Sequence, residues 1–196
     1  MLASGAMSHS VLVSWALTAA INLAAPGSPP SLDRVADGVV TAAEENPAFA
    51  GEDGVAQTVA VLLAIAWRES GFKVAAAGDC PGLAPGSREC TADKRAQSLG
   101  LFQIGRGNAG WLGVSVADLT GEPVVQARIA LRMVRTSFKI CATRPLEERL
   151  GWFHHGHEGC SDSSAGRARM RLAREILRRW PAPKEKNLEP RASNLD

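Results

Sequence analysis

Apolar residues fill the chain almost without interruption from Val55 to Trp67, where the sequence reads VAQTVAVLLAIAW with one glutamine and one threonine. A helix that carries apolar residues on every side is buried, whereas a surface helix keeps a polar face. Asp53 precedes this stretch as a candidate N-cap, and Gly71 follows it where helices commonly end in a left-handed residue. The pattern therefore predicts a buried central helix that ends at Gly71.

Helical spacing of apolar residues recurs along much of the remaining chain, with residues typical of helix starts and stops at its ends. The other predicted helices cover about 31–45, a short segment after the Ser115–Asp118 capping box, 123–138, 145–154 and 164–180. Residues 73–97 are rich in Gly, Pro and charge and predict a loop, with room for a small β element within 73–104. We expect a mainly α fold with little or no β structure.

The expected organisation is a single domain over residues 31–180, followed by a disordered tail over 181–196. Residues 1–30 form an apolar segment without Lys, Arg, Asp or Glu, and two interpretations fit it. The run at 11–25 has the length of the apolar part of a secretory signal peptide, although no positive charge precedes it. Alternatively, Trp15 and its apolar neighbours share one helical face and predict a first helix of the domain.

Composition narrows the classes of function. The chain has 196 residues, enough for the core of one domain, and its net charge of +2 gives no bulk attraction to nucleic acid. No apolar stretch reaches the length of a membrane-spanning helix. We therefore expect a monomer that neither binds nucleic acid nor crosses a membrane.

Four cysteines, Cys80, Cys90, Cys141 and Cys160, allow three pairings. Nearest-neighbour pairing would fasten the loop between the first two and would tie the segment near the third to the loop that holds the fourth. Cross-links in such irregular segments remove much of the entropy of the unfolded chain, and they form in oxidising compartments outside the cytoplasm. The alternative is four unpaired cysteines in a cytosolic protein.

Glu69 is the strongest candidate for chemistry, because it closes the buried helix predicted above. Desolvation and the negative end of the helix dipole both disfavour its charged form and would raise its pKa toward neutral pH. A carboxyl group that stays protonated near neutral pH can act as a general acid. The plainer alternative is an ordinary exposed glutamate in the last turn of a core helix.

A second motif, Ser98-Leu-Gly-Leu-Phe-Gln-Ile104, follows the Gly- and Pro-rich loop. Gly100 lets the backbone adopt a strained turn or approach a ligand closely. Phe102 offers a flat apolar face for a sugar ring, and Gln103 offers a donor and an acceptor for the hydroxyl or acetamido groups of a glycan. The alternative is a buried strand or helix start with a satisfied glutamine.

The order of these motifs, Glu69-Ser-Gly-Phe followed by Gly100-Leu-Phe-Gln-Ile, resembles the signature of the lysozyme-like lytic transglycosylases (SLT type) and the related goose-type lysozymes. Trp152-Phe-His-His-Gly156 is a counterpart of their third element, Ala-Tyr-Asn-Ala-Gly. The resemblance covers residues 55–180 and implies a lysozyme-like fold, peptidoglycan glycan strands as substrate, an extracytoplasmic location and no cofactor. It implies Glu69 as the catalytic residue and a substrate-binding set of Ser70, Ser98, Gly100, Phe102, Gln103, Phe153 and His154.

The resemblance implies a transglycosylase reaction at the β-1,4 bond between N-acetylmuramic acid and N-acetylglucosamine. Protonated Glu69 would give its proton to the glycosidic oxygen and then remove a proton from the sugar's own 6-hydroxyl, which leaves a 1,6-anhydro end. Hydrolysis is the nearest alternative, and it needs a second carboxylate that Asp79 or Asp93 could supply.

Several positions depart from the family pattern and keep a non-catalytic alternative open, a lysozyme-like scaffold that binds glycan or serves an assembly. The sequence has no Tyr, and Phe153 stands where the family carries the Tyr that hydrogen-bonds the catalytic Glu. His154 replaces the usual Asn, and Gly78 stands where a Ser is expected. The lost hydrogen bond would have to come from His154 or Ser98, or be dispensable.

Two features of the C-terminal part each have a structural and a functional interpretation. The final predicted helix carries six arginines and an apolar stripe of Met170, Ala173, Leu177 and Trp180. We expect the stripe to dock on the domain and the arginines to face solvent, the alternative being attraction to an anionic wall polymer or membrane surface. The run 154–160 has zinc-ligand residue types without a standard ligand spacing, so no metal site is expected.

Overall fold

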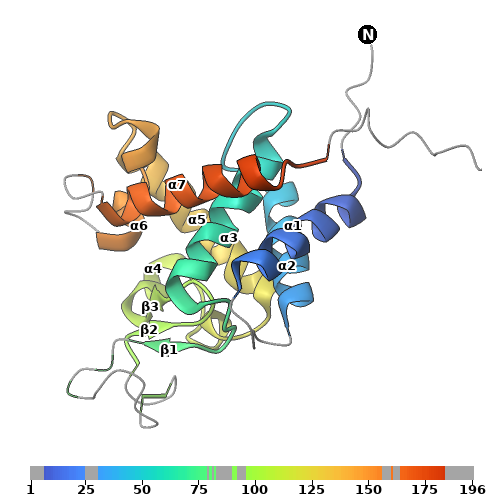
Figure 1. The fold of residues 1–196 in the computed structure, drawn as a ribbon. Helices are drawn as coiled ribbons and strands as arrows, with labels where there is room; N and C mark the ends of the chain where they lie inside the picture. The colour runs from blue at the N-terminus through green and yellow to red at the C-terminus, as the bar shows by residue number, and fades with distance from the viewer. Residues whose placement is uncertain are drawn as a thin grey trace, which may run out of the picture.

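The computed structural model describes residues 7–24, 31–78, 80, 82, 90–91, 96–155, 160 and 164–183. These residues form a mainly helical fold with a small sheet, as expected (Figure 1). The α-helices are α1 (His9–Leu23), α2 (Leu32–Glu45), α3 (Gly54–Ser70), α4 (Ala109–Leu112), α5 (Pro123–Ile140), α6 (Gly151–His155) and α7 (Ser164–Arg179). Three short 3₁₀ helices are η1 (Arg106–Asn108), η2 (Ala117–Leu119) and η3 (Leu146–Glu148). No helix within the described ranges is long and apolar enough to cross a membrane.

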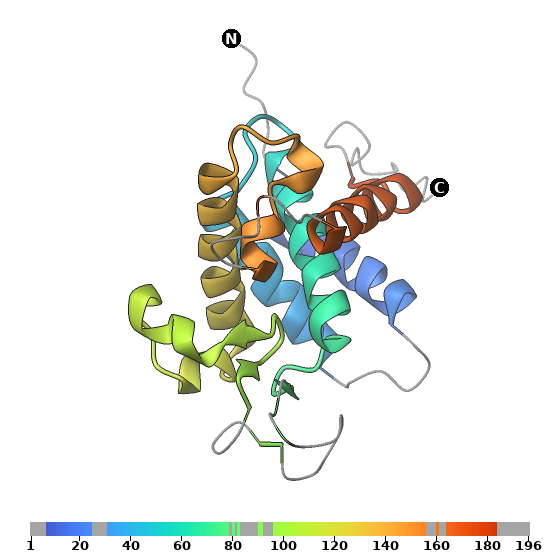
Figure 2. The ribbon, with the colours of Figure 1, turned by 90° about the vertical axis from the view of Figure 1, so that its left-hand side faces the viewer.

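Helix α3 is the centre of the fold, and α1, α2, α5 and α7 contact it (Figures 1 and 2). Its side chains are buried continuously from Thr58 to Ala66, because apolar residues lie on every side of the helix. Gly71 ends it with a φ of 59°, and the Gly71 N–H donates to the Trp67 carbonyl at 3.0 Å. Asp53 occupies the N-cap position without a side-chain cap hydrogen bond. The predicted buried helix and its end at Gly71 are therefore confirmed.

Helix α1 packs against α2 and α3, as the first-helix interpretation of the N-terminal apolar segment predicts. Leu12, Trp15 and Ala16 are among its buried residues. The indole N–H of Trp15 donates to the Trp180 carbonyl at 2.7 Å, which joins α1 to the segment that follows α7. This helix is thus an integral part of the core, and the domain observed in the structure begins before residue 31. Residues 184–196 of the predicted tail lie outside the described part of the chain.

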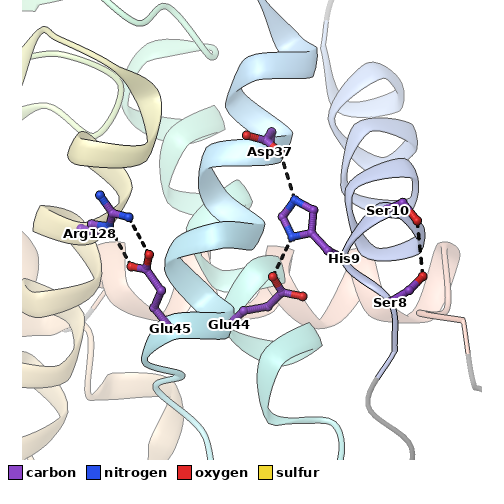
Figure 3. Close-up of polar contacts among 7 residues, drawn as sticks. All are labelled: Ser8, His9, Ser10, Asp37, Glu44, Glu45 and Arg128. Atoms are coloured by element: carbon purple, nitrogen blue, oxygen red, sulfur yellow. Dashed lines mark hydrogen bonds and ion pairs between the residues drawn. The ribbon is translucent and has the colours of Figure 1, made fainter.

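Exposed charged contacts connect α2 to its neighbours (Figure 3). His9 lies between Glu44 and Asp37, with Nδ1 2.7 Å from the Glu44 carboxylate and Nε2 3.1 Å from the Asp37 carboxylate. Hydrogen bonds to Glu44 and Asp37 raise the pKa of His9 above its ordinary value. On the other side of α2, the guanidinium of Arg128 on α5 donates two hydrogen bonds to the Glu45 carboxylate.

The small sheet contains β1 (Ala77–Gly78), β2 (Ser98–Leu99) and β3 (Ile104–Gly105), in the order β1-β2-β3 with antiparallel neighbours. It confirms the small β element expected within 73–104. Gly100 forms the turn after β2 with a φ of +75°. A Cβ atom there would lie 1.8 Å from the Leu119 carbonyl oxygen and 2.3 Å from Oε1 of Gln126, so no other residue fits without a shift.

One predicted helix is broken. The residues predicted as a continuous helix over 145–154 form η3 and the separate helix α6. In a continuous helix the Phe153 N–H would donate to the Arg149 carbonyl, but the hydroxyl of Ser137 stands between them. It accepts from the Phe153 N–H at 3.1 Å and donates to the Arg149 carbonyl. A side chain of α5 inserted into the helical hydrogen-bond ladder is a known cause of such breaks.

Two disulfides join the cysteines in nearest-neighbour pairs, Cys80 with Cys90 and Cys141 with Cys160. The second disulfide ties the C-terminal end of α5 to the segment between α6 and α7. Arg144 reinforces this link, because its Nε donates to the Cys160 carbonyl at 2.8 Å. The pairing that fastens both irregular segments is confirmed, and two disulfides indicate an oxidising environment.

Candidate functional site

Four of the residues that the sequence marks as site candidates line one cleft of about 360 Å³. They are Glu69, Ser98, Gln103 and Phe153, and Ile104, Gly105, Asn108 and Met133 complete the lining. Figures 1 and 2 show why segments so far apart in sequence meet: the C-terminal end of α3, the sheet and α4 lie at the same end of the molecule. Helix α6 packs on α5 and α7 and contributes Phe153.

Glu69 lies in the last turn of α3, with a side chain 14% exposed, and it forms an ion pair with Arg169 of α7. Nε of Arg169 lies 3.0 Å from Oε1 of Glu69, and Nη2 contacts the same oxygen. A third group of this arginine, Nη1, donates to the Ala165 carbonyl at 2.8 Å within α7. The guanidinium is therefore held in a fixed orientation beside the candidate acid.

Arg169 changes the electrostatics that the sequence predicts for Glu69. Burial and the helix dipole favour the neutral carboxyl group, whereas an adjacent guanidinium favours the charged carboxylate. The expectation that the arginines of the last helix face solvent is wrong for Arg169, which is 6% exposed. The signal was present in the sequence, because Arg169 falls on the same helical face as Gly166, Met170 and Ala173.

Gln103 combines a cleft position with a structural role. Its backbone has a φ of 48°, in the left-handed region, and its Nε2 donates to the Gly100 carbonyl at 2.9 Å and to the Ala76 carbonyl at 3.4 Å. A Cβ atom at Gly78 would lie 2.1 Å from Oε1 of Gln103. The glycine at position 78 therefore makes room for this side chain.

Three members of the predicted substrate-binding set make contacts within the fold. Ser70 donates to the Leu101 carbonyl at 2.8 Å and so fastens the end of α3 to the second motif. Phe102 is 1% exposed and does not line the cleft, so its interpretation as a sugar platform is wrong. Gly100 is buried against Leu119 and Gln126, and its close approach is to the protein rather than to a ligand.

Gln126 of α5 supports the cleft and was not found from the sequence. Its side chain is 2% exposed, accepts from the Leu101 N–H at 2.6 Å, and donates to the carbonyls of Val74 and Gly121 at 3.1 and 2.8 Å. One buried amide thus satisfies three backbone groups from three segments around the second motif. A polar residue flanked by apolar neighbours on the inner face of α5 was the available signal.

Some predicted residues lie partly or wholly outside the described part of the chain. Phe153 is 9% exposed in α6, and the backbone of His154 follows it, but the His154 side chain is among the parts not described. Asp79 and Asp93, the candidates for a second carboxylate, also fall outside it, as does most of the histidine-rich run at 154–160. Among the described residues that line the cleft, Glu69 is the single carboxylate.

A larger cavity of about 620 Å³ lies between α2 and α5, but it lacks a comparable group. The one carboxylate among its described lining residues, Glu45, is 46% exposed and paired with Arg128. Arg132, Arg135 and Lys139 make the remaining lining strongly basic. The smaller cleft, with its partly buried carboxyl group, is therefore the candidate active site.

The chain matches no protein-family model, no curated protein and no solved structure in the comparisons made with each.

Proposed function

We propose that this protein has a lysozyme-like fold and cleaves the β-1,4 glycan strand of peptidoglycan, with Glu69 as general acid and base. The observation that carries this proposal is the meeting of Glu69 with Gln103, Ser98 and Phe153 in one cleft. These residues come from three separate motifs, whose order along the chain resembles that of lytic transglycosylases. A partly buried carboxyl group beside amide, hydroxyl and aromatic groups suits the recognition and cleavage of a sugar polymer.

The proposed reaction has two proton transfers. Glu69 protonates the glycosidic oxygen, the bond between that oxygen and the anomeric carbon breaks, and the next sugar leaves with a new hydroxyl group. The same side chain, now a carboxylate, takes the proton of the 6-hydroxyl as the 6-oxygen bonds to the anomeric carbon. The internal hydroxyl is favoured over outside water because it is already held next to the reacting carbon.

The test compares the wild-type chain with Glu69→Gln on purified peptidoglycan. Wild type should release muropeptides with 1,6-anhydro ends, identified by mass spectrometry, and the variant should lose at least about 100-fold in rate because it cannot supply a proton. Glu45→Gln is the matched control, since it removes a carboxylate that also pairs with an arginine but lies outside the cleft. Equal rates for wild type and Glu69→Gln would overturn the catalytic role, and reducing ends would indicate lysozyme-type hydrolysis.

The ion pair with Arg169 favours a second candidate function, glycan binding without cleavage. A guanidinium beside Glu69 stabilises the carboxylate, which cannot donate a proton. In that case wild type would sediment with insoluble peptidoglycan and release no fragments under any condition tested. The two disulfides support an extracytoplasmic location, where either function would meet this polymer.

A further inference from the structure

Trp111 of α4 is an aromatic side chain that the fold leaves in contact with solvent. It is 44% exposed, whereas the other exposed large apolar residues in the described ranges are aliphatic: Ile21, Ile140 and Leu146. An exposed indole offers a large, flat apolar surface that a ligand with a matching apolar face can cover.

Two neighbours place Trp111 at the edge of the candidate cleft. Its indole N–H donates at 3.0 Å to Oδ1 of Asn108, which lines the cleft together with Glu69. Its ring also meets the ring of Trp152, with centroids 5.8 Å apart and planes at 75°. Trp152 directly precedes Phe153, a second lining residue. Trp111 thus bridges α4 and α6 beside the cleft.

The ring is held in one orientation. Besides Asn108 and Trp152, the guanidinium of Arg132 lies over the indole at 5.9 Å from the ring centroid. Arg132 is itself fixed, because its Nη1 donates to the Leu112 carbonyl at 2.6 Å. A side chain fixed before binding loses little conformational entropy when a ligand covers it.

We propose that Trp111 is a sugar-binding platform that receives a ring of the same glycan strand next to the rings held inside the cleft. The inference rests on the proposed function, which supplies the strand. The apolar C–H face of a pyranose ring complements an indole face whose N–H is already bonded within the protein. Trp111 would then take the role that the sequence suggests for Phe102, which is buried.

The test measures the binding of β-1,4-linked N-acetylglucosamine dimers and hexamers to the wild-type chain by titration calorimetry. Wild type should bind the hexamer more tightly than the dimer, because the hexamer reaches Trp111. Trp111→Ala should weaken hexamer binding about tenfold, the loss typical of a removed aromatic stacking surface, and should leave dimer binding unchanged. Trp111→Phe, which keeps a flat ring, should restore part of the loss, whereas Trp111→Leu should not.

Ile140→Ala is the matched control, since it also removes an exposed apolar side chain but lies outside the cleft lining. Hexamer binding by Trp111→Ala equal to wild type would overturn the platform and leave the proposed function standing. An equal loss for dimer and hexamer would overturn it as well, because Trp111 would then shape the cleft itself. Failure of the wild type to bind either oligomer or insoluble peptidoglycan would instead overturn the proposed function.

Discussion

Two glutamate–arginine pairs occupy contrasting environments in this protein. Glu69 meets Arg169 where α3 and α7 pack together, and their side chains are 14% and 8% exposed. Glu45 meets Arg128 on the outer face of α2 and α5 (Figure 3), and their side chains are 46% and 48% exposed. Water screens the outer pair, whereas the inner pair has given up most of its hydration.

The buried pair lies at the candidate site, whereas the exposed pair lies on the surface and away from it. A buried pair contributes little net stability when intact, but removing one partner leaves an uncompensated charge in the interior. The carboxyl group proposed to react is therefore the one whose partner cannot be removed without leaving a charge in the interior. The outer pair has no such consequence, because either partner can be solvated alone.

The largest effect is expected from Arg169→Met. Removal of the guanidinium leaves the Glu69 carboxylate buried and without this partner, which should lower the free energy of unfolding by about 3 kcal/mol. Urea titration followed by circular dichroism measures the change at pH 7. Arg128→Met, the matched change in the exposed pair, should leave the unfolding midpoint where it is in wild type.

A double variant sharpens the same comparison. Arg169→Met combined with Glu69→Gln removes both charges of the buried pair, so the double variant should be more stable than Arg169→Met alone. If Arg169→Met unfolds at the same urea concentration as Arg128→Met, burial of the Glu69–Arg169 pair does not make the loss of its arginine more destabilising.

A smaller effect on the free energy of unfolding is expected at Gln126, whose buried side chain is polar but uncharged. Gln126→Met keeps the length of the side chain but leaves the Leu101 N–H and the Val74 and Gly121 carbonyls without this partner. The loss should be about 2 kcal/mol in the free energy of unfolding. Hydrogen exchange gives a local readout, since the Leu101 amide should exchange faster in the variant. Unchanged protection of that amide would contradict the role assigned to Gln126.

The smallest effect on the free energy of unfolding is expected at His9, which belongs to the exposed charged contacts of α2. Its pKa is raised in the folded protein by hydrogen bonds to Glu44 and Asp37, so its stabilising contribution is complete below the unfolded value near 6.5. That contribution is lost as the pH rises through the folded pKa. The stability difference between wild type and His9→Gln should therefore be below about 1 kcal/mol and should shrink from pH 5.5 to pH 8.5. Urea titrations at both pH values measure it, and a difference that grows with pH would contradict the assignment.

Sequence patterns predicted those helices that are determined by residues close together in the sequence. Helix α3 follows from an unbroken apolar run, and Gly71 ends it because glycine accepts a left-handed backbone. The break before α6 could not be predicted in this way, because the hydroxyl that causes it belongs to Ser137, a residue of another helix. The spacing of apolar residues within one segment predicts a helix, but it gives no information about a side chain that inserts from another helix.

The site shows the same division. The spacing and order of the motifs predicted Glu69, Gln103 and Phe153 as site residues, and the structure places them in one cleft. Phe102 was misread because an aromatic residue in a turn reveals its chemistry but not its burial. Arg169 was missed as a partner of Glu69 because an ion pair between residues 100 positions apart depends on how two helices pack.

The Cys141–Cys160 disulfide has a practical consequence for all work on this protein. It closes a loop that contains α6, and with it the Phe153 wall of the cleft. A bond across a sequence separation of 19 stabilises a folded domain by about 3 kcal/mol. Material made in a reducing host, or assayed in buffer with dithiothreitol, would lack this restraint. Production should therefore use an oxidising secretory route, with thiol titration as the measure of sample quality.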